Sequence, residues 1–556
     1  MVNGNDRVGN LTINPNQTLY QAYTNANSDN LEASALYDLE KGLCFSHKDV
    51  MEKIDQAADG FWGIGARRNS RVGIMTNNSI YEPICFLALN KIGAVTKFLD
   101  YSKSVSDIQT SINVSRVEYL IIEAEFLEIE PAINTSCVPV VILDSSSPKR
   151  NTMHTTFEEL CLTANTQCIE SEFQKDKPSV IINSSGTTGT PKPIVHSDYS
   201  LNIAVNKMLH TDFPLTRSNV MLKVFPSHIG LGLITTLYTC LLSGTPIVLN
   251  KFKIPPEESI NKSVHFIFGF RRWIKEKNLS QDAKLLLFFA PIFVRGMYNQ
   301  IGTCTDLSFI GAMLAAGSRM AKEELDKIEL VFREKGCPVP VCNGYGQNEM
   351  CGAVTLNRNA QNKNGSAGFP VILTELKIVD SDTLVPVPIG QTGKVLERSE
   401  SRFLYYDHAS EQTEKAFITL QDGSTWFDSK DLEYLDDDGF LYITGRTSRV
   451  LIRFDHKISI DGIEQKIKSN SIVSDCAIIP IIDDHINGSS IAFIALQNDS
   501  KIYNSDQIAE IIQSGDFPLS DFETPTYYVC IDSIPYMANG KIDYERLNEM
   551  SKSIQL

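Results

Sequence analysis

Apolar runs of strand length alternate with segments of helical periodicity through the first third of the chain. Such runs stand at residues 72–75, 117–122 and 138–143. Residues 80–92 carry apolar side chains at helical spacing, with Phe86, Leu87 and Leu89 on one face. Alternating strands and helices predict an α/β fold in which helices flank a mostly parallel sheet.

The apolar stretch at residues 229–249 is long enough to cross a bilayer. The segment 243–246, Ser-Gly-Thr-Pro, interrupts it, and threonines are spread through its first half. Glycine and proline mark turns, so the composition favours a buried helix, a turn and a buried strand at 247–249. We therefore expect no transmembrane segment.

The apolar run 180–182 leads into a segment of hydroxyl residues and glycines that ends in a lysine. Its sequence is Ser184-Ser185-Gly186-Thr187-Thr188-Gly189-Thr190-Pro191-Lys192. Glycines let the backbone approach a ligand closely, and successive amides can form an anion-binding nest. Hydroxyl groups and an ammonium group suit phosphate. The pattern predicts a loop that wraps a polyphosphate, although a flexible linker has the same composition. A P-loop would end in Gly-Lys-Ser/Thr, which is absent here.

The 556 residues exceed what one hydrophobic core normally holds, so two or more domains are expected. The formal net charge is -16 at pH 7. That sign argues against binding to nucleic acid or to an anionic membrane, because both need a basic face. The 12 cysteines form no C-x-x-C pair, which is typical of thiols in a reducing compartment. With no secretory signal at the N-terminus, we expect a cytoplasmic protein.

Two small-residue turns are candidate ligand contacts. Ala316-Gly317-Ser318 is either a tight strand-to-helix turn or a place where backbone lies against a ligand. Asn343-Gly344-Tyr345-Gly346-Gln347-Asn348-Glu349 places a ring that could stack on a base four residues before a carboxylate. Taken alone, this second segment is equally compatible with a Gly-rich turn and a partly buried tyrosine.

Three other polar positions stand out. His228 follows Pro226 before an apolar helix, where a histidine is more often packed or capping than catalytic. Asp431 precedes an Asp-Asp-Asp-Gly segment at 436–439 that has the composition of a hairpin turn. Lys541 follows Asn-Gly, which by itself is typical of a solvated turn.

Taken in order, these segments resemble the motifs of the adenylate-forming enzymes: acyl-CoA synthetases, peptide-synthetase adenylation domains and luciferases. The phosphate-loop signature, the Asn-x-Tyr-Gly motif, the Asp431 to Arg446 segment and the final Gly-Lys all occur in family order. The resemblance extends from Leu31 to Leu547. Four motifs in sequence over nearly the whole chain are hard to obtain by chance.

The resemblance implies a role for each matching residue. Tyr345 packs on adenine beside Asn343, Asp431 accepts the ribose hydroxyls, and Lys541 bridges the carboxylate and the α-phosphate. The catalytic set is Lys541, Thr188, Glu349 and His228, with Thr188 and Glu349 as magnesium ligands. The implied nucleotide-binding residues are Ser184, Ser185, Gly186, Thr187, Thr188, Gly189, Lys192, Ala316, Gly317, Ser318, Asn343, Gly344, Tyr345, Gly346, Gln347, Asn348, Asp431, Arg446 and Lys541.

The resemblance also implies two domains. Residues 1–446 would form a large domain of mostly parallel sheets, and residues 447–556 a small mobile α+β domain that opens with a hairpin. The chain departs from the family pattern at Pro193, Asn348, Lys430, Arg449, Phe454 and Asp455. Arg449 takes the hinge position, and the last two could narrow the channel for a pantetheine thiol.

The implied function is ATP-dependent activation of a carboxylic acid to acyl-AMP, followed by transfer to a thiol, most often that of coenzyme A. Residues 225–232 lack the aspartate with which amino-acid activators pair the substrate ammonium, so a fatty or aryl acid is favoured. Phe268, Phe289 and Leu314 are candidates for lining its pocket. Three alternatives stay open: a ligase that loads a carrier protein, one that stops at acyl-AMP, and a non-catalytic nucleotide or acyl binder.

Overall fold

The structure is a computed structural model of the chain. It describes residues 2–3, 12–134, 138–143, 154–162, 167–184, 192–253, 256–317, 320–446, 449–453, 456–470, 472–481, 489–497, 504–513, 519–520, 523–537 and 542–552. The chain divides into two compact units. The large unit comprises Val2–Glu375 and Arg398–Phe417, and the small unit comprises Leu376–Glu397 and Ile418–Leu556. The predicted boundary between residues 446 and 447 stays a prediction.

One sheet of the large unit has a parallel centre and antiparallel edges. Its order is β17 (Phe369–Pro370), β16 (Gly352–Leu356), β15 (Val341–Gln347), β14 (Ile310–Ala315), β13 (Leu285–Phe289), β11 (Val220–Lys223), β12 (Ile247–Leu249), β2 (Ser34–Asp38) and β3 (Cys44–Ser46). Strands β11 to β14 are buried throughout. Such continuous apolar strands are typical of a parallel sheet that is covered on both faces.

The second sheet of the large unit is also mostly parallel. Its order is β20 (Tyr405–Tyr406), β10 (Pro193–Ser197), β9 (Pro178–Asn183), β5 (Val95–Phe98), β4 (Arg71–Met75), β6 (Tyr119–Glu123), β7 (Val140–Leu143) and β8 (His154–Thr156). The apolar runs predicted as strands at 72–75, 117–122 and 138–143 are therefore confirmed as β4, β6 and β7.

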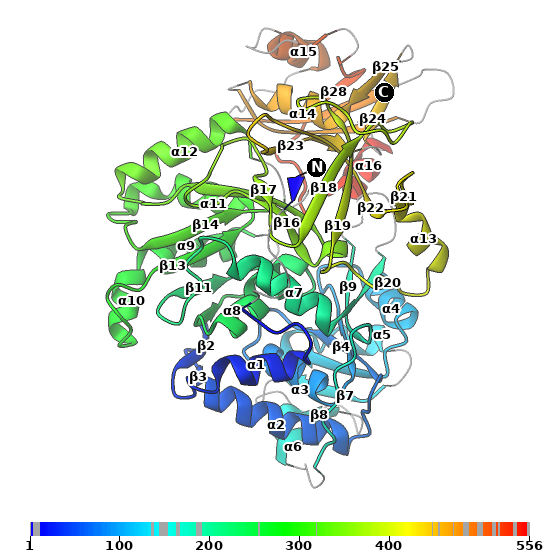
Figure 1. Cartoon of the computed structure of the whole chain (residues 1–556). Helices are drawn as coiled ribbons and strands as arrows, with labels where there is room; N and C mark the ends of the chain where they lie inside the picture. The colour runs from blue at the N-terminus through cyan, green and yellow to red at the C-terminus, as the bar shows by residue number, and fades with distance from the viewer. Residues whose placement is uncertain are drawn as a thin grey trace. The chain divides into compact units, whose positions relative to one another are not determined.

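Helices surround these sheets, and Figure 1 shows α3 beside both α1 and α2, against which it packs. The helices of the large unit are α1 (Leu19–Asn27), α2 (His47–Gly63), α3 (Glu82–Lys91), α4 (Val105–Val114), α5 (Glu130–Ile133), α6 (Phe157–Leu162), α7 (Asp198–Leu209), α8 (Thr239–Ser243), α9 (Glu257–Phe268), α10 (Phe270–Glu276), α11 (Pro291–Asn299), α12 (Lys322–Glu334) and α13 (Ser410–Lys415). Shorter turns are η2 (Ala124–Phe126), η4 (Ile301–Thr303) and η5 (Asn348–Met350).

Helix α3 confirms the prediction of a helix near residues 80–92, but it is buried on every side rather than on one face. Its polar residues are satisfied inside the protein. The Asn90 side chain donates to Ser179 Oγ at 3.0 Å and to Asp198 Oδ1 at 2.7 Å. Buried amides need such partners. Helix α3 is therefore mostly apolar, and the buried Asn90 side chain within it is hydrogen-bonded.

The apolar stretch 229–249 folds as helix, turn and strand, as predicted. Its first part, η3 (Leu231–Tyr238), is a π-helix in which Thr236 Oγ1 donates to the Gly232 carbonyl at 2.6 Å. Helix α8 follows and ends at Gly244, whose φ of 69° is the left-handed conformation that glycine adopts easily. Among the described residues, no helix combines the length and apolar character that spanning a bilayer requires.

The small unit combines mostly antiparallel strands with helices. One group is β18 (Thr374–Val379), β19 (Gly393–Ser399), β22 (Thr425–Leu435), β21 (Phe417–Thr419) and β23 (Leu441–Arg446). The predicted turn at 436–439 joins β22 to β23, with Gly439 N bonded to the Asp436 carbonyl. The predicted hairpin after residue 449 is β24 (Val450–Arg453) and β25 (His456–Ser459), while Phe454 and Asp455 lie outside the described residues.

The last sheet of the small unit is buried on both faces. It consists of β26 (Val473–Pro480), β27 (Ser490–Leu496) and β28 (Tyr527–Cys530), and the helices of this unit are α14 (Ile460–Lys468), α15 (Ser505–Gln513) and α16 (Tyr544–Lys552). Alternate residues of β27 face opposite cores. Ile494 packs with Ile463 of α14, and Phe493 packs with Leu547 of α16. The predicted α/β class, with an α+β C-terminal part, is confirmed.

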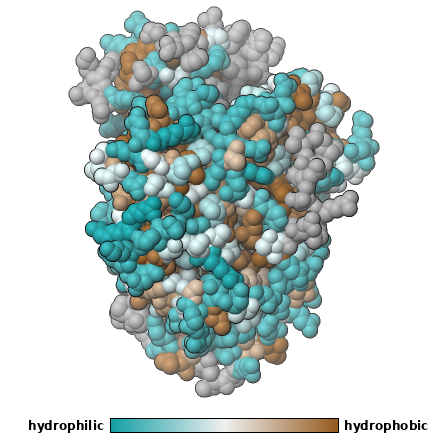
Figure 2. Space-filling view, turned by 60° about the vertical axis from the view of Figure 1, so that its left-hand side comes forward, coloured by the Kyte–Doolittle hydropathy of each residue, from teal (hydrophilic) through white to brown (hydrophobic). Residues whose placement is uncertain are grey.

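The face of the protein seen in Figure 2 is mostly polar, and the described cysteines are unpaired. Figure 2 shows a face that is mostly hydrophilic, with apolar residues in scattered groups. The cysteines within the described ranges are all free, and most are buried. Free cysteines agree with the unpaired thiols expected from the absence of C-x-x-C spacing.

Candidate active site

The base of the predicted phosphate loop is closed by paired strands. β9 and β10 are antiparallel, with Asn183 opposite Pro193. Beyond them, Ser184 N donates to the Lys192 carbonyl at 2.8 Å, and Lys192 N donates to Ser184 Oγ at 3.0 Å. Ser185, Gly186, Thr187, Thr188 and Gly189 lie outside the described residues. The two described ends of the loop therefore lie side by side, and Lys192 is exposed.

Asn348 connects this base to two other predicted site segments. Its Nδ2 donates to the Asn183 carbonyl at 2.7 Å, and its Oδ1 accepts from Gly230 N at 3.1 Å. A Cβ at Gly230 would approach Asn348 Oδ1 to 2.6 Å. The hydrogen bond between Gly230 N and Asn348 Oδ1 therefore favours glycine at position 230. Asn348 thus fixes the phosphate-loop strand, the Glu349 turn and the start of η3 in one arrangement.

Buried Lys97 of β5 lies beneath the same strand end. Its ammonium donates to Asn183 Oδ1. Burial lowers the pKa of Lys97 to about 7, and the charges of Asp407 and Asp100 oppose this shift without cancelling it. Lys97 is therefore a poorly compensated cation next to the strand end at which the predicted phosphate loop begins. No feature of the sequence had indicated Lys97 as a site residue.

The predicted adenine turn is strand β15, held tightly between its neighbours. A Cβ at Gly344 would come within 2.5 Å of Leu356 Cδ2, and one at Gly346 within 2.0 Å of the Gly352 carbonyl. Both glycines are therefore required by packing against β16. Tyr345 between them is half-buried. The segment expected as a Gly-rich turn is therefore an extended strand, in which two tightly packed glycines flank the half-buried Tyr345.

Two buried polar atoms of strand β15 have no hydrogen-bond partner among the described residues. Asn343 Oδ1 and Gln347 Nε2 are buried and, within the described part of the chain, have no hydrogen-bond partner. A buried amide atom without a partner is costly, so a bound group that supplies a donor to Asn343 would be stabilised. The exocyclic amino group of adenine is such a donor. These atoms fit the base that the resemblance implies.

The predicted turn at Ala316 ends the strand next to β15. Ala315 pairs with Asn343, and Ala316 N donates to the Phe289 carbonyl at 2.9 Å. Gly317 has a φ of 95°, a left-handed conformation that favours glycine. Ser318 lies outside the described residues. The structure thus brings Ala316 and Gly317 to the same end of the sheet as Asn343.

His228 stands between β11 and η3 and is buried. Its Nε2 lies 3.3 Å from Asp100 Oδ1, and Tyr101 meets the imidazole edge-on with ring centres 5.5 Å apart. Burial lowers the pKa of His228, and the Asp100 charge opposes that effect. A neutral imidazole beside a carboxylate is therefore favoured. Asp100, which directly follows the buried strand β5 and Leu99, was not predicted as a site residue.

Glu349 is fixed both through its backbone and through its side chain. Phe403 N donates to the Glu349 carbonyl at 2.7 Å, and the Tyr406 hydroxyl donates to Glu349 Oε1 at 3.0 Å. The described residues contain no group of three His, Cys, Asp or Glu side chains suited to a metal. Magnesium needs no such group, because it binds through one or two carboxylates, phosphate oxygens and water. A single oriented carboxylate therefore fits magnesium held on a polyphosphate.

The small unit carries the predicted ribose site. Asp431 is buried on β22, and its backbone pairs with that of Arg446 on β23. Lys430, one of the departures from the family pattern, has a φ of 65°, a left-handed conformation that glycine adopts more easily. Asp431 and Glu397 help to raise the pKa of Glu433, for which burial is the main cause. Asp431 thus lies on β22 close to a second buried carboxyl group whose pKa is raised.

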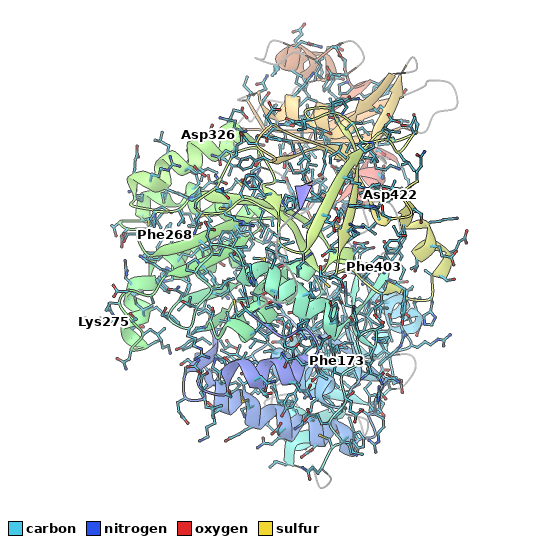
Figure 3. All side chains as sticks on the ribbon, viewed as in Figure 1. Phe173, Phe268, Lys275, Asp326, Phe403 and Asp422 are labelled. Carbon is cyan, nitrogen blue, oxygen red and sulfur yellow. The ribbon has the colours of Figure 1, made fainter. Side chains whose placement is uncertain are left out.

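The remaining predictions are placed as follows. Lys541 lies outside the described residues, and its flanks are joined, since Tyr536 pairs with Ile542. Phe289 and Leu314 are fully buried in β13 and β14. Phe268 ends α9, and Figure 3 places it on the other side of the large unit from Phe403. Phe268 therefore lies away from the segment that holds Glu349.

Comparison with known proteins decides the family. The family model for the AMP-binding enzymes matches residues 23–406. The chain belongs to the AMP-binding enzyme family. This membership confirms the resemblance drawn from the sequence motifs. It also means that the described parts of the phosphate loop, the adenine turn and the Glu349 turn all fall within the matched region.

Relatives of this AMP-binding enzyme are similar over nearly its whole length. The 4-coumarate–CoA ligase-like protein 3 of Arabidopsis thaliana is 24% identical over 98% of this chain and 94% of its own. A solved anthranilate–CoA ligase in complex with anthranoyl-AMP has a TM-score of 0.80 at 21% identity, covering 99% of each chain. The benzoate–CoA ligase of Burkholderia xenovorans LB400 has a TM-score of 0.79 at 16% identity, with 95% and 99% covered. These structures confirm the fold.

Proposed function

We propose that this AMP-binding enzyme is an ATP-dependent acid–thiol ligase. In the first step a carboxylate oxygen attacks the α-phosphorus of ATP, the bond to the β-phosphate breaks, and acyl-AMP and pyrophosphate form. In the second step a thiolate attacks the acyl carbonyl, a thioester forms and AMP leaves. The family membership and the names of the relatives, which are CoA ligases, support this proposal.

The observation that carries the proposal is the hydrogen-bonded connection through Asn348. It joins the strand end at Asn183, which begins the phosphate loop, to the turn that carries Glu349. Polyphosphate on the loop would then lie next to the carboxylate. Catalysis of phosphoryl chemistry depends mainly on position and on stabilising charge. We assign Thr187, Thr188 and Lys192 to the polyphosphate and Glu349 with Thr188 to magnesium, which when bound supplies positive charge to the phosphate oxygens.

The nucleoside half of ATP fits the other predicted residues. We assign Tyr345 to adenine stacking and Asn343 to the amino group, because Asn343 Oδ1 is a buried acceptor without a partner among the described residues. Asp431 is assigned to the ribose hydroxyls and Arg446 to ribose or phosphate. His228, neutral and held beside Asp100, is assigned to the acyl and phosphate end of the site.

The acid is an aryl or fatty carboxylate. The segment before η3 has no acidic residue to pair with an amino-acid ammonium. The relatives are named for 4-coumarate, anthranilate and benzoate, which favours an aromatic acid. Coenzyme A is the proposed acceptor. We further propose a cytoplasmic location, in keeping with free buried thiols, and cell fractionation tests it.

The proposal includes residues 447–556 as a small domain that brings in Lys541. Lys541 would bridge the attacking carboxylate and the α-phosphate, so removing its charge should hinder acyl-AMP formation without removing the contacts to adenine. Limited proteolysis that cuts near residue 446 would support this boundary. Fragments that begin near residue 418 would instead support a boundary like that of the compact units.

Acid-dependent exchange of labelled pyrophosphate into ATP tests the function directly. A panel of aryl, fatty and amino acids identifies the substrate, and added CoA or carrier protein identifies the acceptor. Lys541→Ala should lower exchange by about 100-fold or more, the scale of one lost charged contact in a transition state, while ATP affinity stays nearly unchanged. Lys552→Ala, on the last helix, is the matched control. Exchange that is unchanged in Lys541→Ala contradicts the assigned role.

A further inference from the structure

Tyr406 contacts both the Glu349 carboxylate and the Lys192 ammonium, which are far apart in the sequence. It lies on the edge strand β20, where it pairs with Ile194 of β10, the strand that leaves the phosphate loop. Its side chain is 7% exposed. Glu349 is 57 positions away along the chain. Only the folded sheet brings the phosphate-loop strand, the Glu349 turn and Tyr406 together.

The hydroxyl of Tyr406 orients the Glu349 carboxylate. It donates to Glu349 Oε1 at 3.0 Å. A tyrosine hydroxyl carries one proton at neutral pH and a carboxylate only accepts, so the hydroxyl is the donor in this contact. A carboxylate has about four acceptor sites, and one hydrogen bond uses only part of that capacity. The contact therefore directs the carboxylate while leaving it able to bind a cation.

The ring of Tyr406 holds a second charged group. Lys192 Nζ lies over the ring, 5.1 Å from its centre, which is within the range of a cation–π contact. Lys192 is the lysine of the phosphate-loop signature, and its backbone closes the loop base on Ser184. One side chain thus contacts both the carboxylate and the ammonium that are assigned to magnesium and polyphosphate.

The segment before Tyr406 also holds the Glu349 turn. Phe403 N donates to the Glu349 carbonyl, and the Phe403 and Tyr406 rings pack with centres 4.8 Å apart. Tyr406 N in turn donates to Thr413 Oγ1 at 3.0 Å, which ties β20 to α13. The tyrosine is therefore rigidly placed, and rigid support is what a precisely oriented ligand group requires.

We infer that Tyr406 is a positioning residue that orients Glu349 and Lys192 for a magnesium-bound nucleotide polyphosphate. The inference rests on the proposed function, because Glu349 is assigned to magnesium there. Tyr406 touches neither substrate nor metal in this role. It acts through Glu349, much as a hydrogen-bonded partner orients a metal ligand.

The chain contains a matched control in the same unit. Tyr199 is 8% exposed, its hydroxyl donates to Glu400 Oε2 at 3.3 Å, and Lys175 Nζ lies 4.3 Å from its ring centre. Its buried ring and hydroxyl therefore have the same two kinds of charged partner, a carboxylate and an ammonium. Glu400 and Lys175 are both about half exposed and belong to no predicted motif.

Magnesium-dependent ATP binding tests the inference without relying on turnover. Titration calorimetry of the full-length chain measures ATP affinity with magnesium and with EDTA. Tyr406→Phe keeps the ring and removes the hydroxyl, so affinity in magnesium should fall by about tenfold, the scale of one hydrogen bond to a charged group, while affinity in EDTA stays the same. Tyr199→Phe should change neither value. An equal loss in EDTA, or no loss in magnesium, overturns the inference.

A double-mutant cycle separates positioning from general structural damage. In a Glu349→Gln background the magnesium-assigned charge is gone, so adding Tyr406→Phe should change affinity by less than about twofold. If the second change is as large as in the wild type, Tyr406 acts elsewhere and the inference fails. A wild type that binds magnesium-ATP but exchanges no pyrophosphate with any acid would overturn the ligase function alone, since the binding result stands by itself.

Discussion

Two cations, the largely buried Arg449 of the small unit and the fully buried Lys97 of the large unit, have opposite kinds of partner. The Arg449 guanidinium contacts the Asp461 carboxylate, donates to Glu464 Oε1 at 2.6 Å and lies over the Tyr544 ring. These charges keep the pKa of Arg449 above its usual value despite burial. Lys97 has an amide oxygen as its hydrogen-bond partner, and burial lowers its pKa to about 7.

The difference separates a structural charge from one that suits a ligand. Arg449 and its carboxylates compensate each other inside one unit, so that cluster needs nothing else. The charge on Lys97 is compensated poorly by the fold, and it stands beneath the strand that enters the phosphate loop. A polyphosphate there would favour the charged form of Lys97. A buried cation therefore indicates an anionic ligand only when the fold itself supplies no carboxylate that pairs with it.

The largest effect is expected from breaking the compensated pair. Arg449→Met leaves the buried Glu464 carboxylate without its guanidinium, which should lower the free energy of unfolding by about 3–5 kcal/mol. Denaturant unfolding followed by circular dichroism measures the change. Arg449→Lys keeps the charge but loses the fork-shaped contact, so its loss should be smaller.

A second variant checks the cause of that loss. Adding Glu464→Gln to Arg449→Met removes the orphaned charge, so much of the stability should return. If the double variant is as unstable as the two single losses combined, the pair is not coupled, and the contrast between Arg449 and Lys97 is wrong.

The sequence predicted well those features that depend on local signals. β4, β6, β7 and the helix, turn and strand at 229–249 follow from apolar runs and from the Gly and Pro residues that interrupt them. Gly344 and Gly346 were part of a motif, and the structure supplies the reason, which is the close approach of β16. The family itself followed from motif order.

The features that the sequence missed depend on contacts between distant segments. Tyr406 meets Glu349 through the pairing of β20 with β10, and Asp100 meets His228 from a different sheet. Asn348 departs from the family pattern, yet its amide bridges two backbones, which no local pattern encodes. Such partners become visible only when the topology is known.

The next effect concerns the pH dependence of stability. The unfolded chain holds the Lys97 proton up to about pH 10.5, while the folded protein releases it near pH 7. Between these values the folded state binds fewer protons, so the free energy of unfolding gains up to about 1.4 kcal/mol per pH unit from this group as pH rises. Below pH 7 the burial of the charged form is a constant cost.

Lys97→Met removes this term. The stability difference between wild type and Lys97→Met should shift in favour of the wild type by about 2–3 kcal/mol from pH 7 to pH 9. Denaturant unfolding at several pH values measures it, and groups common to both proteins cancel. Lys415→Met, at a lysine whose side chain is 73% exposed, should keep the wild-type slope. A slope that Lys97→Met leaves unchanged would show that Lys97 is charged throughout this range.

The smallest effect is expected at a cation that has a carboxylate partner but little burial. The Lys430 side chain is 56% exposed beside buried Asp428, which also has Lys394 at 3.3 Å. Lys430→Gly loses a solvent-screened pair and adds chain entropy to the unfolded state, but it relieves a left-handed backbone at φ 65°. These terms offset one another, so the free energy of unfolding should change by less than about 0.5 kcal/mol.

The control is Lys430→Ala, which keeps the backbone strain and loses the ion pair. It should be less stable than Lys430→Gly. If Lys430→Gly instead matches the loss in Arg449→Met, partner count alone decides the energy of a cation, and burial does not.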